Sequence, residues 1–176
     1  RNHSSAASDV YKRQNETSTA EVLVDAGEAG ICCHSLIRTK VVENGKPKFL
    51  TSFAYATCKV KSISSELSIP RLELAALLVG TRVGQMLQKT FNLESNKVRL
   101  WSDSQVSIAW TRKTADELSP WHLNRVKVIN ESGFQLRYIP SELNSSDLGT
   151  KEKFCVTPSM LKTCLLYTSP SPRDIG

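Results

Sequence analysis

The first half of the chain alternates short apolar runs with turn residues, as β-strands do. Residues 21–25 (EVLVD) have the pattern of a buried strand that ends in an acid, and glycines follow it. Residues 31–41 and 49–57 predict two further strands, because the segment between them, ENGKPK at 43–48, carries the Asn-Gly and Pro signals of a chain reversal. We therefore expect an antiparallel meander of three strands.

The pattern changes to helical spacing at Ser68. Apolar side chains then recur every three or four residues, at Leu72, Ala76, Val79, Val83 and Met86. Four shorter elements are expected after this helix: a strand at 96–101, helices at 105–111 and 121–130, and a strand at 134–139. A meander followed by strand–helix units predicts an α/β fold, with helices packed on a mixed sheet.

Composition limits the kind of protein. A chain of 176 residues with a formal net charge of +6 fits one domain with an anionic partner. The five cysteines form no C-x-x-C pair, so a thiolate metal site is not expected and reduced intracellular thiols are. No apolar run approaches the roughly 18 residues of a membrane span, so we expect an intracellular protein without a membrane partner.

Both ends of the chain lack helical or strand periodicity. The segments at 4–14 (SSAASDVYKRQ) and 164–174 (CLLYTSPSPRD) resemble translated sequencing adapters, and VYKR and LLYT can be encoded on opposite strands of one short duplex. We interpret residues 1–14 and 164–176 as non-native tails around a domain at 15–163. The alternative is two ordinary disordered tails.

Four carboxylates occupy the ends of predicted elements. Asp25 ends the first strand, Glu73 lies one turn into the long helix, Asp103 follows the fourth strand, and Asp147 begins a last helix. Each acid alone has an ordinary explanation, as a turn, a cap or a solvent-facing helix residue. At one edge of a mixed sheet, however, such positions converge, and clustered carboxylates repel unless a cation binds. Oxygen ligands without His or Cys favour Mg²⁺ or Mn²⁺.

Five ordered blocks in the chain carry a family resemblance. They are VDAGEAG (24–30), SIPRLELAALL (68–78), LWSDSQVSIAW (100–110), NRVKVI (124–129) and YIPSELNSSDLGTK (138–151). Together they resemble the RNase H domain of Pao-type (Bel/Pao) long-terminal-repeat retrotransposon polyproteins. The resemblance implies an RNase H-like fold, in which a five-stranded mixed sheet of three antiparallel strands and then two parallel ones is flanked by helices.

The resemblance also implies an activity. A ribonuclease H is a metal-dependent endonuclease that hydrolyses the RNA strand of RNA/DNA hybrids during reverse transcription, here within a cytoplasmic retroelement particle. Asp25, Glu73, Asp103 and Asp147 would be its catalytic residues and would hold two Mg²⁺, for which Mn²⁺ substitutes. The implied partners are the hybrid and the neighbouring reverse transcriptase and integrase domains of the polyprotein.

This chain departs from the family pattern in two places. The last block usually reads N-P-A-D-L, whereas residues 144–148 read NSSDL, which predicts a looser turn before Asp147. Many RNases H also carry a His shortly before the final Asp; none stands there in this chain, and His122 is too far upstream for that role.

Contacts to the hybrid and two other functions stay open. The candidate nucleic-acid contacts are Ser104, Gln105, Arg112, Lys113, Trp121, Arg125 and Lys127. The alternative for the basic residues and Trp121 is a solvated helix face with a core Trp. A catalytically inactive RNase H-like domain of a degraded element, which binds nucleic acid or tethers polyprotein domains, is the main rival function. An integrase core is disfavoured, because its site ends in a Glu on a late helix, whereas Glu73 comes second here.

Overall fold

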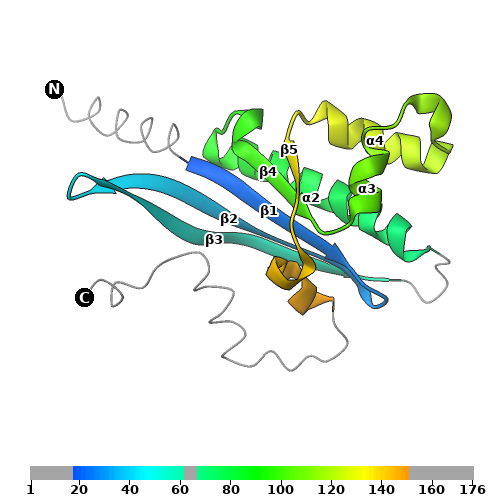
Figure 1. Ribbon diagram of the computed structural model, residues 1–176, viewed down its shortest axis with the longest axis horizontal. Helices are drawn as coiled ribbons and strands as arrows, with labels where there is room; N and C mark the ends of the chain where they lie inside the picture. The colour runs from blue at the N-terminus through cyan, green and yellow to red at the C-terminus, as the bar shows by residue number, and fades with distance from the viewer. Residues whose placement is uncertain (1–17, 62–66, 151–176) are drawn as a thin grey trace.

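A five-stranded sheet forms the centre of the computed structural model, which describes residues 18–61 and 67–150 (Figure 1). The proposed tails at 1–14 and 164–176 lie outside the described residues. The strands are β1 (Ser18–Ala26), β2 (Gly30–Glu43), β3 (Lys46–Val60), β4 (Val98–Ser102) and β5 (Gln135–Tyr138), in the order β3-β2-β1-β4-β5. β1 pairs antiparallel with β2, as β2 does with β3, while β4 runs parallel to both β1 and β5. The predicted mixed sheet is confirmed.

Helices surround the sheet and connect its parallel strands. The α-helices are α2 (Ile69–Phe91), α3 (Gln105–Trp110) and α4 (Pro120–Glu131), and the short 3-10 helices are η1 (Ser95–Lys97), η2 (Ala115–Glu117), η3 (Ser141–Leu143) and η4 (Ser145–Gly149). The long α2 packs against the sheet, and α4 packs against α2. No helix among the described residues is long and apolar enough to cross a membrane.

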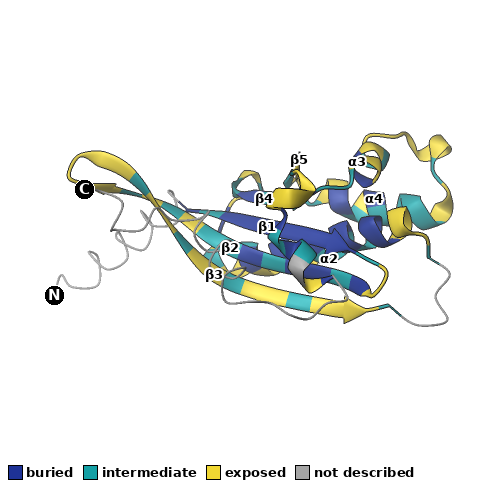
Figure 2. Ribbon diagram, turned by 60° about the horizontal axis from the view of Figure 1, so that its bottom comes forward, coloured by how far each residue is buried: buried dark blue, intermediate teal, exposed yellow. Residues whose placement is uncertain are grey.

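β1 is the most buried strand because it is covered on both faces (Figure 2). Val22 and Val24 point to the core shared with α2, while Leu23 and Asp25 point to the opposite face, which η4 covers. Residues 20–23 of β1 pair with residues 98–101 of β4. The strand has a continuous apolar run because both of its faces are covered, one by α2 and the other by η4.

The face that α2 turns to the sheet is formed by residues at helical spacing. Leu72, Ala76 and Val83 are buried as predicted, but Val79 is half-buried and Met86 is 39% exposed, and Leu87 takes the buried position in the last turns. Gly80 allows close packing: a Cβ atom at this residue would lie 2.5 Å from Val24 Cγ1 and 2.6 Å from a Leu100 methyl. The helix ends at Asn92, in the left-handed conformation typical of a C-terminal cap.

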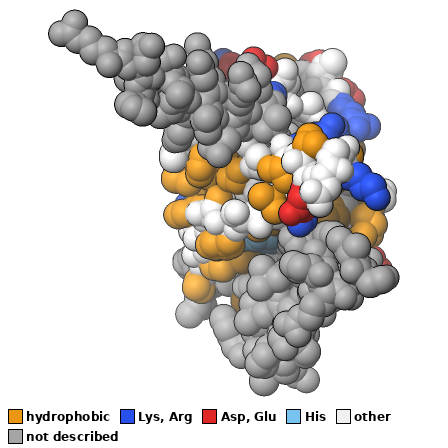
Figure 3. Space-filling view, turned by 90° about the vertical axis from the view of Figure 1, so that its left-hand side faces the viewer, with side chains coloured by type: hydrophobic (Ala, Val, Ile, Leu, Met, Phe, Trp, Pro, Cys, Tyr) orange, Lys and Arg blue, Asp and Glu red, His pale blue; other side chains and the backbone are white. Residues whose placement is uncertain are grey.

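β2 and β3 form a hairpin longer than the sequence predicted. Asn44 and Gly45 both have positive φ, at 52° and 76°, as a two-residue hairpin turn of type I′ requires. The hairpin continues past the first residue of β1, Ser18, which pairs with Thr39. Beyond that pair β2 and β3 are the only strands among the described residues, and this arm is exposed, with the large exposed apolar side chains Val42, Phe49 and Leu50. Figure 3 faces this end of the molecule and shows hydrophobic side chains gathered on its surface.

Candidate metal centre

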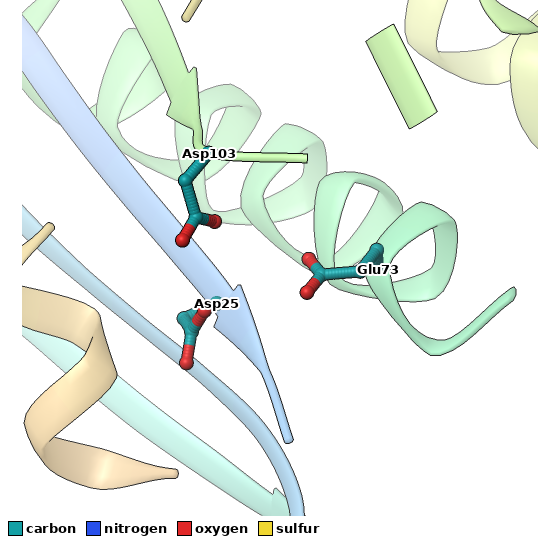
Figure 4. A group of neighbouring side chains, drawn as sticks. All are labelled: Asp25, Glu73 and Asp103. Atoms are coloured by element: carbon teal, nitrogen blue, oxygen red, sulfur yellow. The ribbon is translucent and has the colours of Figure 1, made fainter. Parts of the chain in front are cut away.

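Three carboxylates from three elements meet at the carboxyl end of β1 (Figure 4). Asp25 lies near the end of β1, Asp103 follows β4 directly, and Glu73 lies in the first turns of α2. One oxygen of each side chain lies within 4.8 Å of the others. The predicted convergence of Asp25, Glu73 and Asp103 is therefore present in the structure.

Burial and mutual repulsion determine the protonation of Asp25. Its side chain is 5% exposed, and burial is the largest effect that raises its pKa above the ordinary value. The carboxylates of Asp103 and Asp147 raise this pKa further, while the hydroxyl of Thr150, which donates to Asp25 Oδ2, lowers it. A group in this environment is stabilised by a proton or by a cation.

Glu73 shows the same effect more strongly. It is 9% exposed, so the alternative in which it faces solvent is wrong. Burial, followed by repulsion from Asp25 and Asp103, raises the pKa of Glu73 to about 8. Its Oε2 atom is buried and accepts no hydrogen bond from the described residues. A buried oxygen without a donor, beside two further carboxylates, fits a hard divalent cation such as Mg²⁺.

Asp103 is held by side chains of the segment between β5 and η4. Ser141 Oγ donates to Asp103 Oδ2 at 2.7 Å, and the amide of Asn144 lies 3.4 Å from Oδ1. The Asn144 amide also donates to the carbonyl oxygen of Val24 at 2.9 Å, and its Oδ1 accepts from the backbone N–H of Ser146. Asn144 thus joins the end of β1, Asp103 and the start of η4. Its place in the block N-S-S-D-L was the one sequence signal for this role.

Asp147 is the fourth predicted ligand and lies on η4. It is half-buried, and it is near enough to raise the pKa of Asp25. The group of three mutually close carboxylates does not include it. The backbone N–H of Thr150 bonds to the carbonyl oxygen of Asp147 at 3.4 Å, and the Thr150 hydroxyl bonds to Asp25. The described part of the predicted last helix is thus a 3-10 helix beside the site, and the residues that follow lie outside the described part.

His34 on β2 lies against η4, although nothing in its local sequence marked it. Its Nδ1 atom lies 2.9 Å from Ser146 Oγ, and its Nε2 atom lies 2.8 Å from Ser145 Oγ. The Ser146 hydroxyl donates to the carbonyl oxygen of Leu23 at 2.9 Å. Burial lowers the pKa of His34 to about 4, so the ring is neutral at pH 7.

A cluster of basic and aromatic side chains lies on α4 and the start of α2. The guanidinium of Arg125 stacks on the ring of Trp121, 3.6 Å from its centroid, and that of Arg71 lies 5.6 Å from the same centroid. Burial lowers the pKa of His122, and Arg71 and Arg125 lower it further. Trp121 also packs partly against the core, as the alternative of a core Trp expected. The sequence analysis named Trp121 and Arg125 as candidate contacts and did not name Arg71.

The other candidate contacts have mixed surroundings. Ser104 caps α3, because its hydroxyl accepts from the backbone N–H of Ser107 at 3.2 Å. Lys127 lies 3.8 Å from Glu131 on the exposed side of α4. The side chains of three more candidates are exposed: Gln105, Arg112 and Lys113.

A mixed sheet in the order 3-2-1-4-5, with acids gathered at the carboxyl end of its central strand, defines an RNase H-like domain. The sequence model of the family described as "Pao retrotransposon-like RNaseH-like domain" matches residues 9–104, which is more than half of the chain, and the chain belongs to this family. The matched range contains Asp25, Glu73 and Asp103 and ends before Asp147. No curated protein matched the sequence.

Solved RNase H structures resemble the chain at low sequence identity. RNase H1 from the halophilic archaeon Halobacterium salinarum NRC-1 is 13% identical, with a TM-score of 0.43 over 73% of this chain and 89% of that one. The N-terminal RNase H domain of a Mycobacterium tuberculosis protein is 10% identical, with a TM-score of 0.49 over 73% of this chain and 87% of that one.

Proposed function

We propose that this domain is a ribonuclease H: a metal-dependent endonuclease that hydrolyses the RNA strand of RNA/DNA hybrids during reverse transcription of a Pao-type retrotransposon. The observation that carries the proposal is the meeting of Asp25, Glu73 and Asp103 within 4.8 Å, with one oxygen of Glu73 buried and unbonded among the described residues. Without a cation such a group is stabilised only by taking up protons, and paired divalent ions held by carboxylates are a common catalyst of phosphodiester hydrolysis.

In the proposed site, Asp25, Glu73 and Asp103 would hold the divalent ions, which we take to be two Mg²⁺, and Asp147 would be the fourth ligand. Bound ions of this kind activate a water and stabilise the leaving 3′ oxygen, so the expected product carries a 5′ phosphate. The chain's own contribution is positioning. Ser141 and Asn144 fix the carboxylate of Asp103, and Thr150 fixes that of Asp25. Because burial favours protons on Asp25 and Glu73, ion binding should release protons and be favoured as pH rises.

For hybrid binding, we propose that the Arg71–Trp121–Arg125 cluster contacts phosphates. Stacking on Trp121 fixes the guanidinium of Arg125, while the N–H groups that it does not use remain available to a phosphate oxygen. The Arg125 Nη1 group donates to the Trp121 carbonyl at 2.8 Å, and its buried Nε has no partner among the described residues. Arg112 and Lys113, on the exposed segment after α3, are further candidates for phosphate contacts. Gln105 and Ser104, next to Asp103, are the candidates for contact with the RNA strand.

The test is a cleavage and binding assay on a labelled RNA/DNA hybrid, with Mg²⁺ or with chelator. Wild type should cleave the RNA strand only with the metal. Asp25→Asn should eliminate cleavage while binding stays within a few-fold of wild type, because it removes an ion ligand and leaves the basic surface intact. Asp116→Asn makes the same chemical change at an exposed acid on η2 and should cleave normally.

Two outcomes would contradict the proposal. Full cleavage by Asp25→Asn would show that the three carboxylates do not hold the catalytic ions. A wild type that binds the hybrid but does not cleave it with either Mg²⁺ or Mn²⁺ would favour the inactive binding or tethering domain. One structural observation favours the second outcome: Asp147 is not part of the close group of acids.

A further inference from the structure

The position of Asp147 depends on contacts outside its own helix. η4 has five residues, and so short a 3-10 helix has too few internal hydrogen bonds to be stable alone. The position of the Asp147 carboxylate relative to Asp25 therefore depends on the contacts that hold η4 against the sheet. The side chains just before Asp147, on Ser145 and Ser146, provide such ties.

These ties form a connected chain of hydrogen bonds. Ser146 has one hydroxyl proton, which it donates to the carbonyl oxygen of Leu23, so it must accept from His34 Nδ1 at 2.9 Å. Nδ1 then carries the ring proton. The other nitrogen, Nε2, is left to accept from the Ser145 hydroxyl at 2.8 Å. One neutral ring tautomer satisfies the whole set.

Ser145 and Ser146 bond to the two nitrogens of one imidazole ring, so the three side chains act as one set that ties η4 to β2.

His34 lies on β2, where it can affect how η4 is placed relative to Asp25. It pairs with Leu23 across β1 and β2, and Asp25 follows two residues later on the same face of β1. Both of its ring nitrogens bond to serine hydroxyls of η4, and neither bonds to one of the acids. Its role is therefore positioning.

We propose that His34, Ser145 and Ser146 form a clamp that holds η4 against β1 and so sets the distance between Asp147 and Asp25. The proposal rests on the two-ion site proposed above. In that site the clamp determines the affinity for the ion that Asp147 would bind, and it leaves the other ion largely unaffected. Groups that orient metal ligands typically change ion affinity about 10- to 100-fold when removed.

The experiment uses the full 176-residue chain and Mn²⁺ as the probe, with bound ions counted by electron paramagnetic resonance. His34→Phe keeps a ring but removes both bonds, and it should raise one of the two Mn²⁺ dissociation constants about 10- to 100-fold while leaving the other largely unchanged. Ser145→Ala removes one bond and should have a smaller effect in the same direction. Ser145→Thr keeps the hydroxyl and should restore the wild-type constant. The control is Ser35→Ala, which removes a buried hydrogen bond from the other face of β2.

Two readouts need no metal. Amide hydrogen exchange over residues 144–150 should become faster in His34→Phe and Ser145→Ala but not in Ser35→Ala, and imidazole ¹⁵N shifts in wild type should report a proton on Nδ1 of His34. If His34→Phe does not fold, the comparison of Ser145→Ala with Ser145→Thr still tests the clamp. The clamp would be refuted if His34→Phe and Ser145→Ala both bound two Mn²⁺ with the wild-type affinities. A ring proton on Nε2 of His34 would also refute it. A wild type that binds fewer than two Mn²⁺ would overturn the two-ion site, and the positioning role with it.

Discussion

Glu73→Gln tests the electrostatics of the site without any nucleic acid. The substitution keeps the size of the side chain and removes its charge. In the metal-free protein the pKa of Glu73 is about 8, against an ordinary value of 4.5. Because the folded state raises this pKa, it holds the proton more tightly than the unfolded state does. The resulting stabilisation is complete below pH 4.5 and is lost as the pH rises through 8.

The size of the effect follows from the same values. Each pKa unit corresponds to about 1.4 kcal/mol, so a shift from 4.5 to about 8 gives a loss of roughly 5 kcal/mol between acidic and alkaline pH. Glu73 is 9% exposed, so solvent screening reduces this little. Because Gln does not titrate, the Glu73→Gln variant does not lose this stability as the pH rises. We expect metal-free Glu73→Gln to match wild type near pH 5 and to exceed its stability by a few kcal/mol near pH 9.

The assay is urea unfolding across this pH range, with chelator and again with Mg²⁺. Saturating Mg²⁺ should stabilise wild type at high pH, by about 2.7 kcal/mol at a concentration 100-fold above the dissociation constant, and should stabilise Glu73→Gln less. Glu94→Gln, an exposed glutamate just beyond the far end of α2, is the matched control. The reasoning fails if Glu73→Gln keeps the pH dependence of wild type, or if it is the less stable protein near pH 9 without metal.

Three further predictions concern packing, site geometry and binding. Gly80→Ala should lower the free energy of unfolding by about 1–3 kcal/mol despite the higher helix propensity of Ala, because its Cβ meets Val24 and Leu100; a neutral or stabilised variant in urea unfolding would contradict the packing. Asn144→Ala should destabilise by a similar amount, since it leaves the Val24 carbonyl and the Ser146 N–H without their partner; unchanged unfolding would refute that role. Arg125→Ala should reduce the slope of log binding constant against log salt by about 1, and an unchanged slope would remove Arg125 from the hybrid contacts.

The fold was largely readable from the sequence because its core elements carry unbroken patterns. The apolar run at 21–25 predicted the central strand, the Asn-Gly pair predicted the hairpin turn, and Ser68 marked the start of α2. The extent of the hairpin was underestimated. Its outer part lies beyond the first residue of β1, where most residues are exposed and no alternation of apolar and polar residues is required.

The acids of the site were predictable, but most of their supports were not. Asp25, Glu73 and Asp103 stand at ends of elements, and topology brings such positions together. His34 bonds to residues 111 and 112 positions away along the chain, and no local pattern encodes a partner at that distance. Met86 was misplaced because neighbouring helix residues, here Met86 and Leu87, compete for one buried position, and packing decides between them.

The place of β1 in the sheet has a consequence for how the chain folds. β1 precedes the other described strands in the chain, yet its parallel partner, β4, begins at Val98, and the segment that covers its second face comes later still. Loops of that length slow folding, and until they close an apolar strand remains open to other chains. A polypeptide cut after residue 104, where the family match ends, would leave Leu23 permanently uncovered and should aggregate during expression.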